Sequence, residues 1–291
     1  MKILISGSSG QLGTCISKKF DNALSLTKKD LDLTNSEQIE GVFLKHNPEI
    51  FINCSAYTDV DASEKNKKKC SKINTHALNF LSEECKKNNC LLIHFSTDYV
   101  FDGSFKNPIT ETDVPKQINH YGFSKYMGEK TIKSSGCNFI IFRVSSLFSE
   151  FGKNFVKTMI LLLKNQEKVE VVDDQIMCPT DSNDIAEMIF KIIDSNKLKK
   201  FKNKVYHFCG KKALSWYEFS KIIFDQGEKI GIDFKAKLVP IRSKKNPNVA
   251  ERPKYSVLDC SNIDNDLQPK RLSLEESVTK ILLKSKDGII H

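Results

Sequence analysis

Short apolar runs alternate with longer segments in which apolar residues recur every three or four positions over the first half of the chain. The short runs suit strands buried on both faces, and the longer segments suit helices that cover a sheet. This alternation is typical of βαβ units, so we predict an α/β fold with a Rossmann-type, doubly wound parallel sheet. The predicted strands are 2–6, 23–27, 50–54, 91–96 and 139–144, and the predicted helices are 12–20, 36–45, 71–88 and 121–134.

The alternation continues less regularly beyond residue 148. Two capping boxes, Ser215 with Glu218 and Ser273 with Glu276, predict further helix starts. We expect a dinucleotide-binding domain over 1–148 plus about 180–208. A smaller C-terminal α/β substrate-binding domain would cover about 149–179 and 209–291. The other elements predicted here are helices at 154–164 and about 184–196, strands at 169–172 and 205–208, and an exposed loop at 243–254.

Composition narrows the class of protein. Apolar residues make up 40% of the chain and charged residues 28%, which is ordinary for a globular protein. The longest aliphatic run, 159–163, is far shorter than the roughly 20 residues that cross a bilayer, and no secretory signal precedes the first strand. The nine cysteines contain no C-x-x-C pair, which argues against a disulfide framework or a structural zinc site. We expect a cytoplasmic protein with no membrane partner.

The formal net charge is +9, which raises the question of a nucleic-acid partner. The lysines are spread through helix-like stretches, however, and no basic platform interleaved with aromatic residues is present. We therefore interpret them as solvated surface and expect no nucleic-acid partner. A positive field would still attract a smaller phosphorylated substrate.

A glycine-rich turn follows the first predicted strand directly. The sequence Gly7-Ser8-Ser9-Gly10-Gln11-Leu12-Gly13 then enters a helical pattern. A strand, a glycine turn and a helix in this order bring backbone N–H groups against a pyrophosphate. The spacing G-x-x-G-x-x-G is one residue longer than the usual dinucleotide fingerprint.

Cations follow the second predicted strand. An NAD-selective enzyme would place Asp or Glu there against the ribose 2′-hydroxyl, but this chain has Lys28-Lys29-Asp30. Two lysines favour a 2′-phosphate, so we predict NADPH as the cofactor, with NADH left open as an alternative.

A third cluster contains groups suited to proton transfer. Thr97 stands at the end of the fourth predicted strand, and Tyr121 and Lys125 are spaced by one helical turn. A nearby cation is expected to lower the pKa of the phenol and to make Tyr121 a proton donor and acceptor. We assign no catalytic role to any histidine, and we interpret Trp216 as packing.

Together these motifs resemble the dTDP-4-dehydrorhamnose reductase family, within the extended short-chain dehydrogenase/reductases. The resemblance covers residues 1 to about 283. It rests on G-x-x-G-x-x-G, on Ser96-Thr97-Asp98-Tyr99-Val100-Phe101, on Y-x-x-x-K, and on the stretches 32–35, 56–61, 154–159, 173–175, 179–180, 215–216 and 252–253.

The resemblance implies an NADPH-dependent reduction of the C4 keto group of a dTDP-4-keto-6-deoxyhexose, dTDP-4-dehydro-L-rhamnose to dTDP-L-rhamnose, for surface polysaccharide biosynthesis. It implies that Thr97, Tyr121 and Lys125 react, the last two also touching the cofactor. The other implied cofactor residues are Gly7, Gly10, Gln11, Leu12, Gly13, Asp32, Leu33, Ala56 and Tyr57, beside Lys28 from the charge argument. The implied substrate residues are Thr58, Asp98, Tyr99, Asn154, Gln175 and Arg252.

Three positions depart from the family pattern. Ser146 stands where many relatives have Trp, which puts the identity of the hexose in doubt. Cys15 stands where some relatives carry a Glu linked to magnesium at a dimer contact, so we predict no metal site. Cys178 replaces a usually small residue and is interpreted as packing.

Two alternatives remain open at this point. The chain could reduce another nucleotide-activated 4-keto sugar, such as a UDP-linked amino sugar or the precursor of a talose-type product. It could instead be a non-catalytic regulatory subunit of the methionine adenosyltransferase type, although the presence of Tyr121 and Lys125 disfavours this. The sequence leaves open whether the protein is a monomer or a homodimer.

Overall fold

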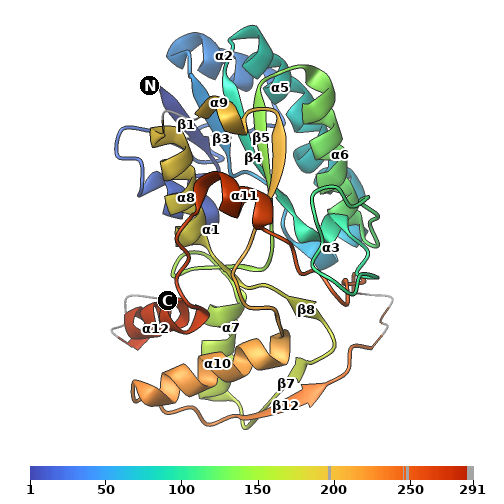
Figure 1. Ribbon diagram of the computed structural model, residues 1–291, viewed down its shortest axis with the longest axis vertical. Coiled ribbons are helices and arrows are strands. Elements are labelled where there is room, and N and C mark those ends of the chain that lie inside the picture. Colours follow the sequence, from blue (N-terminus) through green and yellow to red (C-terminus); the bar gives the residue numbers. More distant parts are fainter. Residues whose placement is uncertain (196–197, 245, 247–248, 287–291) are drawn as a thin grey trace.

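A six-stranded parallel sheet forms one half of the molecule (Figure 1). The computed structural model describes residues 1–195, 198–244, 246 and 249–286. The strand order is β10-β5-β4-β3-β1-β2, so the direction of winding reverses between β1 and β3. The strands are β1 (Ile3–Ser6), β2 (Leu24–Leu26), β3 (Ile50–Asn53), β4 (Leu91–Thr97), β5 (Phe139–Val144) and β10 (Lys204–Phe208).

Helices cover both faces of this sheet, as the alternating pattern predicts (Figure 1). Apolar residues of α1, α8 and α11 form one core with the sheet, and those of α2, α5 and α6 form the other. The α/β doubly wound fold is therefore confirmed. The helices named here are α1 (Gln11–Ser17), α2 (Ser36–His46), α5 (Ala77–Lys87), α6 (His120–Ser135), α8 (Ser182–Asp194) and α11 (Ser261–Leu267).

The prediction of one continuous helix over 71–88 is wrong, because a π-helical turn interrupts it. The chain instead forms α4 (Lys67–Ser71), a π-helical turn η1 (Lys72–His76) and then α5. A π-helical turn inserts an extra residue into a helix and often lies at functional sites. Here it directs Asn74, which is only 2% exposed, toward the interior.

A smaller α/β unit lies beside the carboxyl ends of the sheet (Figure 1). Its core is formed mainly by α7, α10 and α12 with the parallel pair β7 and β12. Strand β12 (Lys237–Ile241) was not predicted, because proline is uncommon within strands and the segment contains Pro240. None of its five residues is fully buried. The elements of this unit are α7 (Phe155–Asn165), β7 (Lys168–Val172), β8 (Ile176–Met177), β11 (Leu214–Ser215), α10 (Trp216–Lys229), β12 (Lys237–Ile241) and α12 (Leu274–Lys286).

Local capping explains where several helices begin. Both predicted capping boxes form, since Ser215 and Glu218 exchange hydrogen bonds at α10, and Ser273 and Glu276 do so before α12. The remaining short elements are α3 (Val60–Lys65), η2 (Asp98–Val100), β6 (Leu147–Phe148), β9 (Thr180–Asp181) and α9 (Leu198–Phe201).

The C-terminal third crosses back to the sheet after β12. The backbone of Ser256 donates to Ile176, and Ile109 donates to Val257, so this segment lies between β8 and the loop after β4. The predicted loop at 243–254 is exposed in part, but Ala250 and Pro253 are buried. Of the predicted ranges, residues 196–197, 245, 247–248 and 287–291 lie outside the described residues.

A buried ion pair fastens α6 to the sheet. The Arg143 guanidinium donates two bonds to the Glu129 carboxylate, of 2.9 and 2.8 Å, and both side chains are at most 2% exposed. Ser96 of β4 donates to the same carboxylate. Burial opposes ionisation of Glu129, but the bonds and charge of Arg143 outweigh it and lower the pKa of the carboxyl.

The helices within the described ranges include none that is both long and apolar enough to span a bilayer.

Breaking this pair should destabilise the fold strongly. Arg143→Met leaves a buried carboxylate without its partner, which costs about 3–5 kcal/mol. Lys133→Met is the matched control, because Lys133 lies 3.7 Å from the same carboxylate but is 40% exposed, and exposed pairs contribute about 0–1 kcal/mol. Urea unfolding should show a much larger loss of unfolding free energy for Arg143→Met, and equal losses would contradict this account.

Candidate active site

The glycine turn after β1 packs directly against the end of β3. Gly7 has φ +68°, and a Cβ there would lie 2.8 Å from the backbone of Cys54. A Cβ on Gly13 would lie 2.1 Å from the Gly7 carbonyl oxygen. Glycine is therefore required at both positions, and bare backbone lines the entrance to α1. The first turn of this helix, with Gln11 and Leu12, presents N–H groups that have no partner within the helix.

In the charged turn after β2, the lysine and the aspartate have different surroundings. Lys28 is exposed, whereas the Asp30 carboxylate accepts bonds from both the backbone and the hydroxyl of Thr27. Asp32 accepts bonds from the backbone and hydroxyl of Thr34, which lower the pKa of its carboxyl, and the nearby cations Lys28 and Lys72 lower it further. Leu33 is only 5% exposed and belongs to the core. The exposed Lys28 follows β2, at the position where the sequence predicts recognition of a 2′-phosphate.

The segment after β3 is held by Asn74, which sequence analysis missed. The Asn74 amide accepts a bond from the Tyr57 N–H and donates to the Tyr57 carbonyl, at 2.8 and 3.0 Å. It also donates to the Ser124 hydroxyl of α6. Ala56 and Tyr57 are thereby tied to the helix of the predicted reacting groups. The π-helical turn that positions Asn74 has no signal in the local pattern.

Thr97 and Tyr121 lie together at the carboxyl end of β4, and Lys125 lies one helical turn further along α6. Helix α6 begins after Asn119, whose side chain caps it, so Tyr121 lies in its first turn. Gly122 lets that turn approach the sheet, since a Cβ there would lie 2.0 Å from the Tyr99 carbonyl oxygen. The Tyr121 phenol lies close enough to Thr97 for the hydroxyl to lower its pKa, and its ring meets the edge of the Tyr99 ring at 6.0 Å.

Lys125 points into the protein toward the end of β4. Its ammonium donates to the Phe95 carbonyl at 2.6 Å and lies 3.3 Å from Nε2 of His94. Burial lowers the pKa of Lys125 to about 8 and lowers that of His94 well below its ordinary value. The other ring nitrogen of His94 contacts Asn53, so both ring nitrogens have partners within the protein.

The expected effect of Lys125 on the phenol is not found here. Burial raises the pKa of Tyr121 above its ordinary value, and the Asp98 charge adds to this, while the nearby Thr97 hydroxyl opposes it. The Lys125 ammonium, one helical turn from Tyr121, bonds instead to the backbone carbonyl of Phe95 in β4. Tyr121 is therefore a protonated phenol at neutral pH.

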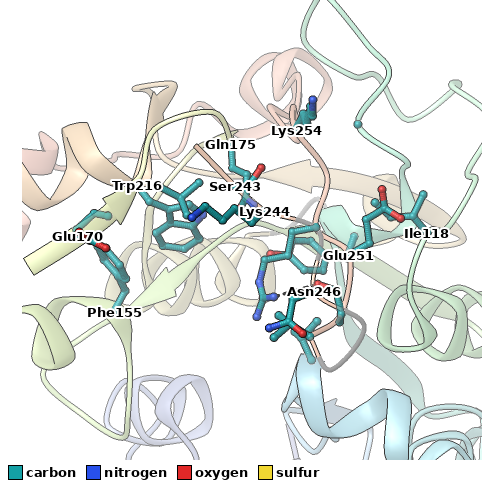
Figure 2. A pocket seen from close by; sticks show the side chains of 18 of the residues that line it. Ile118, Phe155, Glu170, Gln175, Trp216, Ser243, Lys244, Asn246, Glu251 and Lys254 are labelled. Atoms are coloured by element: carbon teal, nitrogen blue, oxygen red, sulfur yellow. Dashed lines mark hydrogen bonds between the residues drawn. The ribbon is translucent and has the colours of Figure 1, made fainter. Parts of the chain in front are cut away.

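A cavity of about 1440 Å³ opens between the sheet and the smaller unit. This volume exceeds the roughly 300–1,000 Å³ of ordinary small-molecule sites. Phe155 and Trp216 form an aromatic wall with ring centroids 4.6 Å apart, and Figure 2 shows Lys244 beside them with Glu251 on the other side. Trp216, interpreted above as packing, thus faces the cavity, and this needed the fold to bring α7 and α10 together.

The predicted substrate residues divide into two groups. Tyr99, Gln175 and Arg252 line the cavity. The described lining does not include the other three. Thr58 is exposed. Asp98 is 2% exposed and bonds to Thr97 and Ser145, and the Asn154 amide caps α7 and donates to Gln11.

Arg252 already has a protein partner. Its guanidinium donates to both carboxylate oxygens of Asp61, at 3.0 and 2.9 Å, and to the Ala250 carbonyl. These bonds use part of its five N–H donors. The residue is therefore anchored at the rim of the cavity with its charge partly compensated.

The positions that depart from the family pattern lie near these features. Ser146 has φ +46° and borders a small pocket with Tyr99, Gln175 and Trp216, so Trp216 supplies an aromatic surface on this side. Cys15 is buried in α1, which raises the pKa of its thiol to about 12. Among the residues with described positions, no group of three or more His, Cys, Asp or Glu could hold a metal ion.

Comparisons with known proteins support the fold and the family resemblance. The family model "RmlD substrate binding domain" matches residues 1–286. The dTDP-4-dehydrorhamnose reductase of Aggregatibacter actinomycetemcomitans is 36% identical over 269 residues, covering 90% of this chain and 92% of that protein. The structure of the Bacillus anthracis dTDP-4-dehydrorhamnose reductase in complex with NADP is 33% identical with a TM-score of 0.89, covering 98% of this chain and 100% of that one. The Clostridium acetobutylicum structure of a dTDP-4-dehydrorhamnose reductase is 33% identical with a TM-score of 0.90, covering the same shares. This chain belongs to the dTDP-4-dehydrorhamnose reductase family.

Proposed function

We propose that the protein reduces the C4 keto group of a dTDP-4-keto-6-deoxyhexose with NADPH, converting dTDP-4-dehydro-L-rhamnose to dTDP-L-rhamnose. The observation on which this rests is that Thr97 ends β4 and Tyr121, in the first turn of α6, lies close to it, with Lys125 one helical turn further along the same helix. Tyr99, two residues after Thr97, lines the large cavity, in a chain of this family. Such an enzyme would supply surface polysaccharide biosynthesis.

The residues around the glycine turn fit a dinucleotide. Side chains at Gly7 and Gly13 would collide with backbone, and the N–H groups of Gln11 and Leu12 in the first turn of α1 have no partner within the helix, which suits a pyrophosphate. Lys28 suits the 2′-phosphate that distinguishes NADPH from NADH, while Asp30 is occupied by Thr27. When bound, the cofactor supplies a hydride to the sugar C4.

The chain's own groups then manage the charge that develops on the sugar oxygen. Tyr121 keeps its proton at neutral pH and donates it to the nascent alkoxide. Thr97, close to the phenol, hydrogen-bonds the same oxygen. Lys125, held by the Phe95 carbonyl, orients the ribose of the cofactor.

The cavity would hold the nucleotide-sugar. Its apolar wall, with Phe155 and Trp216, suits a planar base, and Lys244, Arg252 and Lys254 at the rim suit a diphosphate. We assign residues 1–148 and about 180–208 to the cofactor, and about 149–179 and 209–291 to the substrate. Helix α11 nevertheless packs on the sheet.

We also propose that the enzyme works in the cytoplasm, as a monomer or homodimer. All nine cysteines are free thiols, which suits a reducing compartment.

The direct test is oxidation of NADPH by purified protein with dTDP-4-dehydro-L-rhamnose. We expect turnover with this substrate, slower turnover with NADH, and little with UDP-linked 4-keto sugars. A preference for UDP-linked sugars would overturn the assignment of the nucleotide. Absence of turnover with every 4-keto sugar would overturn the enzymatic function and favour a regulatory subunit.

Tyr121→Phe should lower kcat by about 10²–10⁴-fold, because the proton donor is lost while the ring remains. The affinity for NADPH, measured by fluorescence titration, should stay within about twofold of the parent value. Tyr126→Phe is the control, because it removes a phenol from the same helix. Near-normal kcat in Tyr121→Phe would show that another group donates the proton.

Turnover should also depend on the ionisation of Lys125. Its pKa of about 8 in the free enzyme means that the ammonium is lost as pH rises through 8. We therefore expect kcat/KM for NADPH to fall about tenfold per pH unit above that point, since kcat/KM reports groups of the free enzyme. Lys125→Met should have a low kcat/KM with no such fall. The same fall in both proteins would assign it to a different group.

A further inference from the structure

Two thiols lie in contact at the edge of the sheet, away from the proposed reacting groups. Cys209 directly follows β10, and Cys260 directly precedes α11. Their sulfur atoms are 3.5 Å apart, and the Cys209 N–H donates to the Cys260 sulfur at 3.3 Å. A disulfide needs about 2.05 Å between the sulfurs, so a modest side-chain rotation would close the gap.

The surroundings of Cys260 favour its thiolate. Hydrogen bonds from Cys209 and the positive charge of Arg271 lower the pKa of Cys260, although burial and the Asp264 charge oppose this. Arg271 lies over the Phe208 ring at 4.4 Å and donates from Nη1 to Asp264. Its Nε and Nη2 are buried with no hydrogen-bond partner among the described residues, so this cation is incompletely compensated.

Exposure separates the two thiols. Cys260 is partly exposed, whereas Cys209 is 3% exposed. Reactive cysteines combine partial exposure with a nearby cation, and sensor cysteines often have a second thiol within reach. The buried pair Cys85 and Cys90 contrasts with this, because burial raises the pKa of Cys85 well above its ordinary value.

We propose that Cys260 is a peroxide-reactive site and that Cys209 resolves it to a reversible disulfide. The Cys260 thiolate attacks hydrogen peroxide, the O–O bond breaks, and hydroxide leaves and is protonated to water. The Cys209 sulfur then attacks the sulfenic acid, the S–O bond breaks, and a second water leaves. Two thiols are oxidised by one electron each, the peroxide takes both electrons, and an external dithiol reverses the change.

The disulfide would join two segments that are 51 residues apart in sequence. Residues 254–259, which precede Cys260, form a strap that exchanges backbone hydrogen bonds with Ile176 of β8 and with Ile109. A covalent link to the end of β10 therefore restricts the conformations of the unfolded chain. In the folded protein it also attaches this strap to the sheet. We expect the thermal midpoint of the folded protein to rise by roughly 5 °C on oxidation.

The test is graded oxidation of the purified full-length protein with hydrogen peroxide, followed by alkylation and non-reducing peptide mass spectrometry. We expect Cys209–Cys260 to be the first disulfide formed and dithiothreitol to remove it. The thermal midpoint should rise with its formation and return on reduction. A first link between Cys209 and the neighbouring Cys178, or no intramolecular link, would overturn the proposal.

Variants separate the two roles. In Cys209→Ser, dimedone should label Cys260 after peroxide treatment, because its sulfenic acid is no longer resolved. In Cys260→Ser, neither the label at Cys209 nor the thermal shift should appear. Cys178→Ser is the matched control and should behave as the parent protein does. Labelling of Cys209 in Cys260→Ser would show that Cys209, and not Cys260, is the peroxide-reactive thiol. The disulfide mapping in the parent protein does not depend on the folding of any variant.

Discussion

The buried ion pair between Glu129 and Arg143 determines where the proposed reacting groups lie. Tyr121, Lys125 and Glu129 are spaced by four residues, so they occupy one face of α6 that is turned toward the sheet. Glu129 is bonded to both β4 and β5, through Ser96 and Arg143. The rotation and height of the helix are thereby set relative to the end of β4, where Thr97 stands.

Further contacts along the same helix reinforce this position. The Lys125 ammonium bonds to the Phe95 carbonyl, and Gly122 permits close approach to the backbone of Tyr99. Asn74 ties the other side of α6 to Tyr57. Because buried polar groups are costly when unpaired, each of these bonds favours one arrangement of helix and sheet. The proposed reacting groups are therefore held by contacts within the protein itself.

The substrate side is built differently. Its cavity has an apolar wall from α7 and α10 and a rim of charged side chains, and the segment 249–254, which includes Arg252, lines one side. Arg252 hydrogen-bonds with Asp61, which is 191 residues away in sequence, so this segment joins the two halves of the molecule. In the proposed function, recognition of a nucleotide-sugar thus depends on the junction of the two units, whereas hydride and proton transfer depend on the sheet and α6.

The sequence by itself determined the features that arise within a few residues of one another. These include the buried strands, the glycine turn, the capping boxes and the Tyr121–Lys125 spacing, because strand and helix periodicity and capping act over one or two turns. Tertiary structure alone decided the π-helical turn at Asn74, the exposure of Trp216 to the cavity and the raised pKa of Tyr121. It also decided the partners of Arg252, Asp98 and Cys260. Each of these depends on segments that are distant in the chain, and no local pattern records burial or charge contributed by a distant segment.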